Sequence, residues 1–400
     1  MAQRRSFKIL ETLGRGGFGT VYRAEMTDAG GFSKQVALKV MSYQGEAADG
    51  IARRMRDEAR VLGLLRHRAI VGVNSLVLLE EGWGVVMEFV EGVDLSTTIK
   101  AGRVPVGAAL EMLEEVAGAL EAAYRARPTE GAEPLKLVHR DIKPSNIRIT
   151  RQAEVKLLDF GVAQAEFITR ESEDEREFVM GSARYMAPER RRGTETHQGD
   201  VYALGLVLAN LLTRKRFPDP PGTAPEHARF LSTVLETVRR TIADDDAPEV
   251  RESEQQIKTL LLEMLAYEPS DRPDAGTVER RLRRLRSTLP PPLLRDWADR
   301  TIPRLLAATR DESPDRTRGD TGRIMVERGG KGAATPGATG PEPDSPSRLS
   351  PAPDRAPTGP AAPPQRPASR RAIALAFAAG LLVGVGIAVP ILLFVLPARG

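Results

Sequence analysis

Residues 138–146 read Val-His-Arg-Asp-Ile-Lys-Pro-Ser-Asn, and Leu-Asp-Phe-Gly follows at residues 158–161 after an interval that fits a pair of short strands. The two runs bring two carboxylates, a lysine and an amide close together in the sequence. A single aspartate in such a setting is usually a turn or cap residue. The full set in this order is not explained by turns and caps, so it indicates a site for chemistry.

A glycine-rich run precedes these motifs near the N-terminus. Residues 14–21 read Gly-Arg-Gly-Gly-Phe-Gly-Thr-Val, between strand-like residues 7–13 and 21–26. Glycine lets the backbone turn tightly and bring its N–H groups against phosphate oxygens. Alone, this spacing is a weak signal. In a dinucleotide-binding fold a helix would follow, but residues 20–24 are β-branched and alternating, so we predict a strand–loop–strand hairpin that covers a nucleotide.

A lysine lies within the next apolar strand, which reads Val-Ala-Leu-Lys-Val at residues 36–40. A buried ammonium group needs an anionic partner, because leaving it unpaired in a low-dielectric site costs free energy. Glu58 offers such a partner for Lys39, since it lies on the predicted helix 51–65. The alternative is a lysine on the solvent face of an edge strand.

These motifs in this order resemble the eukaryotic-like (Hanks-type) bacterial serine/threonine protein kinases, specifically the membrane-anchored branch, over residues 7–285. The resemblance implies an α+β, two-lobed protein kinase fold, in which a β-rich N-lobe and a mainly helical C-lobe clamp ATP and Mg²⁺, with Mn²⁺ as an alternative. It also implies transfer of the ATP γ-phosphate to serine or threonine hydroxyls of protein substrates, including the chain itself. Lys143 followed by Pro144 is similar to the serine/threonine branch.

The resemblance assigns roles that fit the chemistry of phosphoryl transfer, in which catalysis is mostly positioning and charge neutralisation. Asp141 would accept the hydrogen bond of the incoming hydroxyl, and Lys143 would reach the γ-phosphate. Lys39, paired with Glu58, would hold the α- and β-phosphates. Hard oxygen ligands suit Mg²⁺. The implied metal ligands are Asn146 and Asp159.

The resemblance also places a nucleotide site and several bracing residues. Residues 86–90 resemble the hinge that binds adenine through its backbone, with Met87 at the gatekeeper place. Ser182 stands where the docking segment usually has threonine, and Glu189 would pair with Arg272. Asp200 matches the acid that braces the catalytic loop, although its local chemistry is that of an N-cap. The implied nucleotide contacts are Leu13, Gly14, Gly16, Gly19, Val21, Ala37, Lys39, Glu88 and Val90, and core packing explains the apolar ones equally well.

Besides Ser182, Arg148 and a lengthened connection at residues 127–136 depart from the family pattern, and one loop raises a question of regulation. Arg148 stands where an apolar residue usually lies beneath adenine, so its stem would pack there while its guanidinium reaches out. Arg140 implies that an anion on the loop 162–180 neutralises a basic pocket, and Thr169 and Ser172 are candidate phosphorylation sites. Our hypothesis is that the four acids within residues 171–175 partly replace a phosphate. The alternative is a solvated charge run.

The composition of the chain limits the kinds of partner and cross-link that it can have. Lys and Arg total 58 against 54 Asp and Glu, a formal net charge of +4, and the charges are interspersed, so nucleic acid is not expected as a partner. The chain has no cysteine, which excludes disulfides and thiolate metal sites. Residues 1–6 are charged and lack an apolar run, so we expect no secretory signal there.

The C-terminal part changes character. We expect a short helical extension at residues 286–310, packed on the main domain or near the membrane, and a disordered Pro/Ala/Gly-rich linker at 311–371. Residues 372–396 contain no charge and are long enough for a single transmembrane helix. Three arginines at 366, 370 and 371 precede that run against Arg399 after it, so we expect the kinase domain on the cytoplasmic side of the cell membrane. Gly380 and Gly384 have a spacing that permits a homodimer, although glycine is common in such helices.

Two classes of protein compete with an active kinase at this stage. A membrane-tethered pseudokinase scaffold would bind nucleotide without turnover, and Arg148 is the residue that favours it. A tethered adaptor would use the Pro-rich spacer, which lacks an aromatic or repeated docking pattern. Five residues that an active kinase needs are all present and argue against the scaffold: Lys39, Glu58, Asp141, Asn146 and Asp159.

Overall fold

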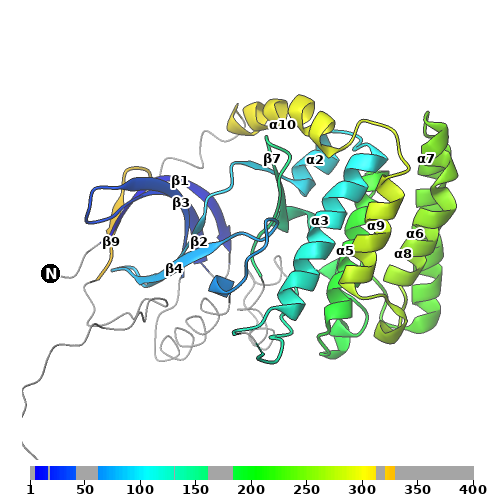
Figure 1. The fold of residues 1–400 in the computed structure, drawn as a ribbon, viewed down its shortest axis with the longest axis horizontal. Coiled ribbons are helices and arrows are strands. Elements are labelled where there is room, and N and C mark those ends of the chain that lie inside the picture. The colour runs from blue at the N-terminus through cyan, green and yellow to red at the C-terminus, as the bar shows by residue number, and fades with distance from the viewer. Residues whose placement is uncertain are drawn as a thin grey trace, which may run out of the picture. The chain divides into compact units, whose positions relative to one another are not determined.

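The architecture comes from a computed structural model with two lobes, shown as a ribbon in Figure 1. The structure describes residues 5–16, 19–41, 62–129, 131–160, 183–311 and 320–328.

The N-terminal lobe is a six-stranded sheet in the order β4-β5-β3-β2-β1-β9, with every neighbouring pair antiparallel. Its strands are β1 (Ser6–Gly16), β2 (Gly19–Thr27), β3 (Ser33–Val40), β4 (Val73–Leu78), β5 (Trp83–Glu88) and β9 (Ile324–Val326). The sheet curls, and apolar side chains that alternate along the strands fill its inner face. Phe7, Ile9 and Leu38 are fully buried there. The lobe therefore has a core of its own.

The strand β9 corrects the sequence prediction of a disordered linker over residues 311–371. β9 pairs with β1, with Phe7 opposite Met325. Glu327 forms a bridge with Leu79, just beyond the end of β4, so the two ends of the sheet meet. The sequence pattern missed this strand because its apolar core is only three residues long, and its partner lies more than 300 positions away in the chain. The β-rich lobe thus takes its last strand from beyond the predicted kinase domain.

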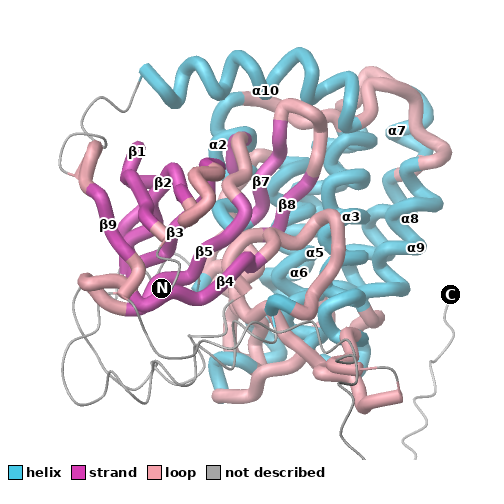
Figure 2. The backbone as a smooth tube through the Cα atoms, turned by 60° about the vertical axis from the view of Figure 1, so that its left-hand side comes forward, coloured by secondary structure: helices cyan, strands magenta, loops and turns pink. Residues whose placement is uncertain are grey.

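The C-terminal lobe is built from helices, which Figure 2 shows beside the sheet. Nearly every residue of its central helix α5 is buried, as expected for a helix that is apolar on all sides. The helices of the described residues are α2 (Leu95–Ala101), α3 (Val106–Arg125), α5 (His197–Thr213), α6 (Ala224–Ala243), α7 (Pro248–Glu252), α8 (Glu254–Met264), α9 (Ala275–Arg286) and α10 (Leu294–Asp311), with short 3₁₀ turns at Pro144–Asn146, Arg190–Arg192 and Pro269–Asp271.

A small three-stranded sheet, in the order β6-β7-β8, lies between the large sheet and the helices. It consists of β6 (Gly92–Asp94), β7 (Ile147–Thr150) and β8 (Val155–Leu157). The 3₁₀ turn Pro144–Asn146 leads directly into β7, and Leu158-Asp159 follows β8. Asn146 precedes this hairpin and Asp159 follows it. Antiparallel pairing of β7 with β8 therefore brings the two residues to the same end of the sheet.

The helix α10 follows the kinase-like region and packs on the C-terminal lobe against α2, α3, β6 and β7. The sequence predicts a helical extension at 286–310, and α10 extends to Asp311. Trp297 and Ile302 are buried against α3 and its neighbours. No helix within the described residues is long and apolar enough to cross a bilayer. The expected membrane helix, residues 372–396, lies outside the described residues.

Candidate active site

The Asp141 carboxylate lies in the loop that leads into the turn Pro144–Asn146, and it is 6% exposed. Lys143 Nζ is 2.8 Å from Asp141 Oδ2, and Asn146 Nδ2 donates to the same oxygen at 2.9 Å. Burial raises the pKa of Asp141, but the charge and hydrogen bond of Lys143, together with His139 and the hydrogen bond of Asn146, outweigh burial and leave the pKa below its usual value. Among the described residues both bonds fall on Oδ2, so Oδ1 is the oxygen left for an incoming hydroxyl.

The backbone of this loop is held by Asp200, in the first turn of α5. The backbone N–H groups of His139 and Arg140 donate to the two oxygens of Asp200, at 2.6 and 2.8 Å. Burial raises the pKa of Asp200 to about 7, while these two hydrogen bonds act in the opposite direction. Thr196 is the N-cap of α5, because its side chain accepts from Gly199 N. Asp200 is therefore a brace for the loop, and its local reading as an N-cap is wrong.

The imidazole of His139 adds a second brace to the loop. It is fully buried and has its Nε2 atom 2.9 Å from the carbonyl oxygen of Leu158. Burial lowers the pKa of His139 to about 4, so the ring is neutral at pH 7. Its Nδ1 accepts from the backbone N–H of Asp141 at 3.2 Å. His139 thus connects the Asp141 loop to the segment that carries Asp159.

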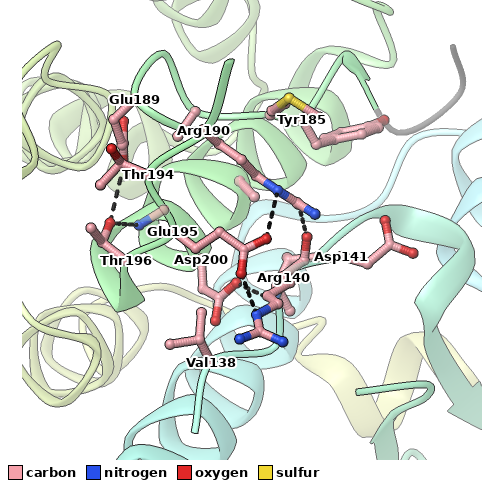
Figure 3. A pocket seen from close by; sticks show the side chains of 15 residues that line it. Val138, Arg140, Asp141, Tyr185, Glu189, Arg190, Thr194, Glu195, Thr196 and Asp200 are labelled. Atoms are coloured by element: carbon pink, nitrogen blue, oxygen red, sulfur yellow. Dashed lines mark hydrogen bonds and ion pairs between the residues drawn. The ribbon is translucent and has the colours of Figure 1, made fainter. Parts of the chain in front are cut away.

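A pocket behind the Asp141 loop is lined by two arginines and two glutamates, shown in Figure 3. Glu195 Oε2 is 2.5 Å from Arg140 Nε, and Glu195 Oε1 is 3.6 Å from Arg190 Nε. Both Nε atoms are buried and neither makes a well-aligned hydrogen bond, so these contacts are ion pairs by charge and distance. Arg190 also donates to the Arg140 carbonyl. Arg140 has a left-handed φ of 71°, which these contacts and Asp200 hold in place.

Glu189 and Arg272 form a buried ion pair, as the sequence analysis expected for these two residues. Arg272 Nη1 and Nη2 donate to the two Glu189 oxygens at 2.7 and 2.9 Å, and both side chains are almost fully buried. Arg272 also donates to the carbonyls of Ala266 and Tyr267, and its guanidinium lies 4.8 Å from the centre of the Tyr202 ring. All three guanidinium nitrogens thus donate hydrogen bonds, which offsets the cost of burying the charge.

Lys39 lies on β3, between β2 and β5, so it belongs to an interior strand and the edge-strand alternative is wrong. Its Nζ is 3.2 Å from Asp159 Oδ1. Asp159 is partly exposed and has a left-handed φ of 47°. The predicted partner Glu58 lies outside the described residues.

The donor set fits a Mg²⁺ ion that is completed by phosphates and water. Asn146 uses its amide nitrogen on Asp141, so its amide oxygen is the atom that would bind a metal, and Asp159 would supply a carboxylate. The described residues contain no cluster of three or more acidic or histidine side chains that could hold a metal by themselves. Mg²⁺ commonly takes few protein ligands beside nucleotide phosphates, so two protein oxygens are compatible with it.

The glycine-rich run forms the predicted hairpin, with Gly16 paired to Gly19 where β1 turns into β2. Gly19 has a φ of 136°, and a Cβ there would lie 2.2 Å from the Val40 carbonyl oxygen, so only glycine fits. Across the sheet, Val21 pairs with Lys39 and Ala37 with Met87. The predicted nucleotide contacts therefore lie on the adjacent strands β1, β2, β3 and β5 and on the segment just after β5: Leu13, Gly14, Gly16, Gly19, Val21, Ala37, Lys39, Glu88 and Val90.

The guanidinium of Arg148 turns toward the hinge. Arg148 lies on β7, and its Nη1 donates to the Val90 carbonyl oxygen at 3.2 Å. Burial lowers the pKa of Arg148, while the charges of Asp94 and Glu11 raise it. The predicted outward reach of this side chain is therefore replaced by a bond to the segment that joins the lobes. Nearby, Lys156 binds both Glu88 oxygens at 2.9 and 3.1 Å.

Three predicted regulatory residues, Thr169, Ser172 and Ser182, lie outside the described residues. Two residues that the sequence analysis did not single out, Arg190 and Glu195, lie beside Arg140 in space. Their local sequence gives little signal, because they belong to a polar stretch that resembles an ordinary surface loop. A glutamate placed shortly before the Asp200 helix, near three consecutive arginines, is the only hint.

A two-lobed molecule with a glycine hairpin, an interior-strand lysine and an acid–lysine–amide loop defines the class of protein kinases. The family described as protein kinase domain matches residues 7–281, and the chain belongs to this family. Members of the family use ATP and Mg²⁺. The match confirms the two-lobed protein kinase fold expected from the sequence motifs.

The relatives are bacterial kinases, which confirms the resemblance to the Hanks-type group. The chain is 33% identical to the tyrosine-protein kinase MasK of Myxococcus xanthus, covering 66% of this chain and 40% of MasK. It is 34% identical to the probable serine/threonine-protein kinase PknB of Lactococcus lactis, covering 52% of this chain and 31% of PknB. The solved PknI kinase domain of Mycobacterium tuberculosis is 25% identical with a TM-score of 0.48, over 70% of this chain and 95% of that domain. The chain thus spans less than half the length of these two curated relatives.

Proposed function

We propose that this chain is a serine/threonine protein kinase that transfers the ATP γ-phosphate to hydroxyl groups of proteins, including its own. The observation that supports this proposal most is the position of Lys143 and Asn146, both bound to Asp141 Oδ2. The arrangement leaves one carboxylate oxygen to orient a hydroxyl and places a cation beside it. A noncatalytic scaffold has no need to keep this geometry.

The proposed mechanism uses Asp141 as an orienting group. Its pKa is held below the usual value, so it is ionised at neutral pH and is a weak base. It would align the incoming hydroxyl and take its proton late, which suits the loose transition state of phosphoryl transfer. The Lys143 ammonium group would contact the γ-phosphate, either in place of Asp141 or while it still contacts Asp141. Lys39 would neutralise the α- and β-phosphates, and Asn146 and Asp159 would hold Mg²⁺, which neutralises the charge that develops on the phosphates.

The choice between hydroxyl types needs a direct measurement, because MasK is named a tyrosine-protein kinase and PknB a probable serine/threonine-protein kinase. Lys143 supports serine and threonine. The full chain would be incubated with labelled ATP and Mg²⁺, with itself and with a generic basic protein as acceptors, and the phosphoamino acids identified. We expect phosphoserine and phosphothreonine, and their absence beside strong phosphotyrosine would overturn the proposed specificity.

A matched pair of variants tests the catalytic assignment. Asp141→Asn removes the charge that orients the hydroxyl, and Asp246→Asn makes the same change at an exposed position far from the loop. We expect transfer to vanish in Asp141→Asn and to persist in Asp246→Asn. If wild-type protein binds nucleotide but transfers no phosphate, the alternative of a pseudokinase scaffold is supported, and Arg148 is the first residue to revert to an apolar one.

We also propose that the chain is held on the cytoplasmic face of the cell membrane by residues 372–396, as a single-pass protein, with residues 329–371 as spacer. The support is the length of the uncharged run and the excess of arginine before it. Full chain and a chain lacking 372–396 would be expressed and their membranes washed with alkaline carbonate. Retention of the first and release of the second are expected; release of both would contradict the proposal.

A further inference from the structure

The segment 320–328 does more than complete a sheet, because its contacts reach the glycine-rich hairpin. Asp320 Oδ2 lies 3.3 Å from Arg15 Nη2 and 3.4 Å from the Tyr22 hydroxyl. Arg15 lies within the glycine run on β1, and Tyr22 lies on β2. A residue from beyond the kinase domain thus contacts both arms of the hairpin that would cover ATP.

The backbone of this segment is joined to the sheet at both ends. At one end, Ile9 N donates to the Arg323 carbonyl and Gly322 N to the Ile9 carbonyl, both at 2.9 Å. At the other end, Glu327 N donates to the Arg5 carbonyl at 3.0 Å and Arg328 N to the Leu78 carbonyl at 2.7 Å. The segment, with β9 at its centre, therefore bridges β1 and the end of β4.

Side chains reinforce this bridge on both faces. Met325 points into the core of the N-terminal lobe and is 2% exposed. Arg5 holds Glu327 with two hydrogen bonds at 2.9 and 3.1 Å, and Arg323 lies 2.8 Å from Glu81. A buried apolar anchor together with a bidentate ion pair is more than an incidental surface contact provides.

The position of β1 explains why such a strand matters for nucleotide binding. Without β9, β1 would be an edge strand, with one side of its backbone unpaired. The hairpin would then be supported from β2 alone, since β2 pairs with β3. With β9 in place, both arms of the hairpin have a neighbouring strand at their base, and this limits how far β1 and β2 can move.

We propose that residues 320–328 are a positioning element for nucleotide binding, which docks on β1 of the same chain and holds the glycine-rich hairpin at the height that MgATP requires. This proposal rests on the proposed function in so far as the ligand is ATP. Asp320 acts on the hairpin directly, and Met325 and Glu327 fix β9, which the turn that carries Asp320 precedes.

The test compares two aspartate substitutions at adjacent positions of β9. Met325→Asp places a charge in the core and should release the strand, whereas Ile324→Asp places it at a side chain that is 63% exposed. Hydrogen exchange of the Ile9 amide and equilibrium binding of MgATP to the full chain would be measured. We expect Met325→Asp to speed Ile9 exchange at least about tenfold and to weaken MgATP binding roughly threefold or more, with Ile324→Asp close to wild type.

The outcomes separate positioning from stabilisation. If Ile9 exchange rises but MgATP binds equally to both variants, the strand only stabilises the lobe and the proposal is wrong. If Ile9 protection falls on dilution of the wild-type protein, the strand belongs to a second copy, which also overturns it. Neither readout requires phosphoryl transfer, so an inactive enzyme would not confuse the result. Should Met325→Asp fail to fold, Glu327→Ala with Asp320→Ala removes surface contacts of the strand and must weaken MgATP binding in the same direction.

Discussion

The Glu195 carboxylate lies 2.5 Å from the Arg140 side chain and also faces Arg190, so one anion of the fold neutralises two cations directly behind Asp141. Arg140 is the neighbour of Asp141 and has a left-handed backbone, so its side chain and backbone position affect the Asp141 carboxylate. The sequence analysis looked for such an anion in the loop 162–180. The structure supplies one from the segment before α5.

Replacing Glu195 by Gln should lower kcat about tenfold, with little change in the KM for ATP. Two guanidinium groups would then face each other without an anion between them, and the loop that carries Asp141 would shift. Steady-state kinetics on a protein substrate would show this. Glu249→Gln, an exposed glutamate in α7, is the matched control and should behave as wild type. Equal kcat values in the two variants would contradict the role of Glu195.

Replacing Thr169 and Ser172 by alanine should leave substantial activity, because carboxylates already neutralise Arg140. Combining these alanines with Glu195→Gln should cost more activity than the two changes separately predict, since the carboxylate beside Arg140 is then lost together with any phosphate on Thr169 or Ser172. A double-mutant cycle on kcat measures this coupling. Complete loss of activity in the alanine variant alone would show that a loop phosphate is indispensable.

Lys39→Met should reduce kcat/KM by about a hundredfold or more, the range seen when a group that stabilises transition-state charge is removed. Lys39 lies on an interior strand and faces Asp159. Lys34→Met provides the control, because Lys34 lies on the same strand with an exposed side chain. Both variants would be assayed for transfer and for MgATP binding. Similar losses in the Lys39→Met and Lys34→Met variants would mean that Lys39 acts only by adding to the positive charge of the lobe, not by contacting the phosphates.

Arg272→Ala should lower the free energy of unfolding by about 3–5 kcal/mol, because it leaves Glu189 as an unpaired buried charge. Arg281→Ala is the control, since its pair with Glu263 is about one-third exposed and such pairs contribute roughly 0–1 kcal/mol. Denaturant unfolding at pH 7 measures both. A small effect at Arg272 would indicate that Glu189 finds water or another partner.

His139 should cost the folded protein stability as the pH falls from about 6.5 toward 4, whereas Asp200, with its pKa raised to about 7, acts in the opposite direction over the same range. His139 has a pKa of about 4 in the folded state, below its ordinary value, so the unfolded chain binds a proton over this range and the folded chain does not. The loss from this group is at most about 3 kcal/mol. Unfolding free energies at several pH values would show it. His139→Gln should remove the loss that His139 causes, so the variant should lose less stability than the wild type over this range, whereas His67→Gln, at a half-buried site, should change the profile less.

The sequence predicted those parts of the site that the chemistry itself constrains. Asp141, Lys143 and Asn146 occur within six residues of each other, and a turn of the chain is enough to bring them together. Glu189 and Arg272 are 83 positions apart, and the family resemblance rather than local pattern anticipated their pairing. Gly19 could be predicted because a positive φ and a close backbone contact leave no room for a side chain.

The remaining features depend on contacts that no local pattern records. Glu195 sits in a polar stretch, and its role is visible only once the turn Arg190–Arg192 has folded back beside Arg140. The strand β9 has three apolar residues, too few for a periodicity to show. It exists because β1 offers an open edge. In both cases the structure of the segment depends on the surface that it contacts. The sequence of the segment alone does not describe that surface.

The pairing of β9 with β1 also determines at which residue a shortened version of this protein should end. A protein that ends at residue 310, the boundary suggested by the sequence, would expose the hydrogen-bonding edge of β1 to solvent. Bare strand edges are templates for strands of other molecules, so such a preparation should form aggregates or swapped dimers, whereas one that ends at residue 334 should stay monodisperse. For anyone who wishes to purify or crystallise the catalytic part, nine residues of apparent linker belong to the folded enzyme.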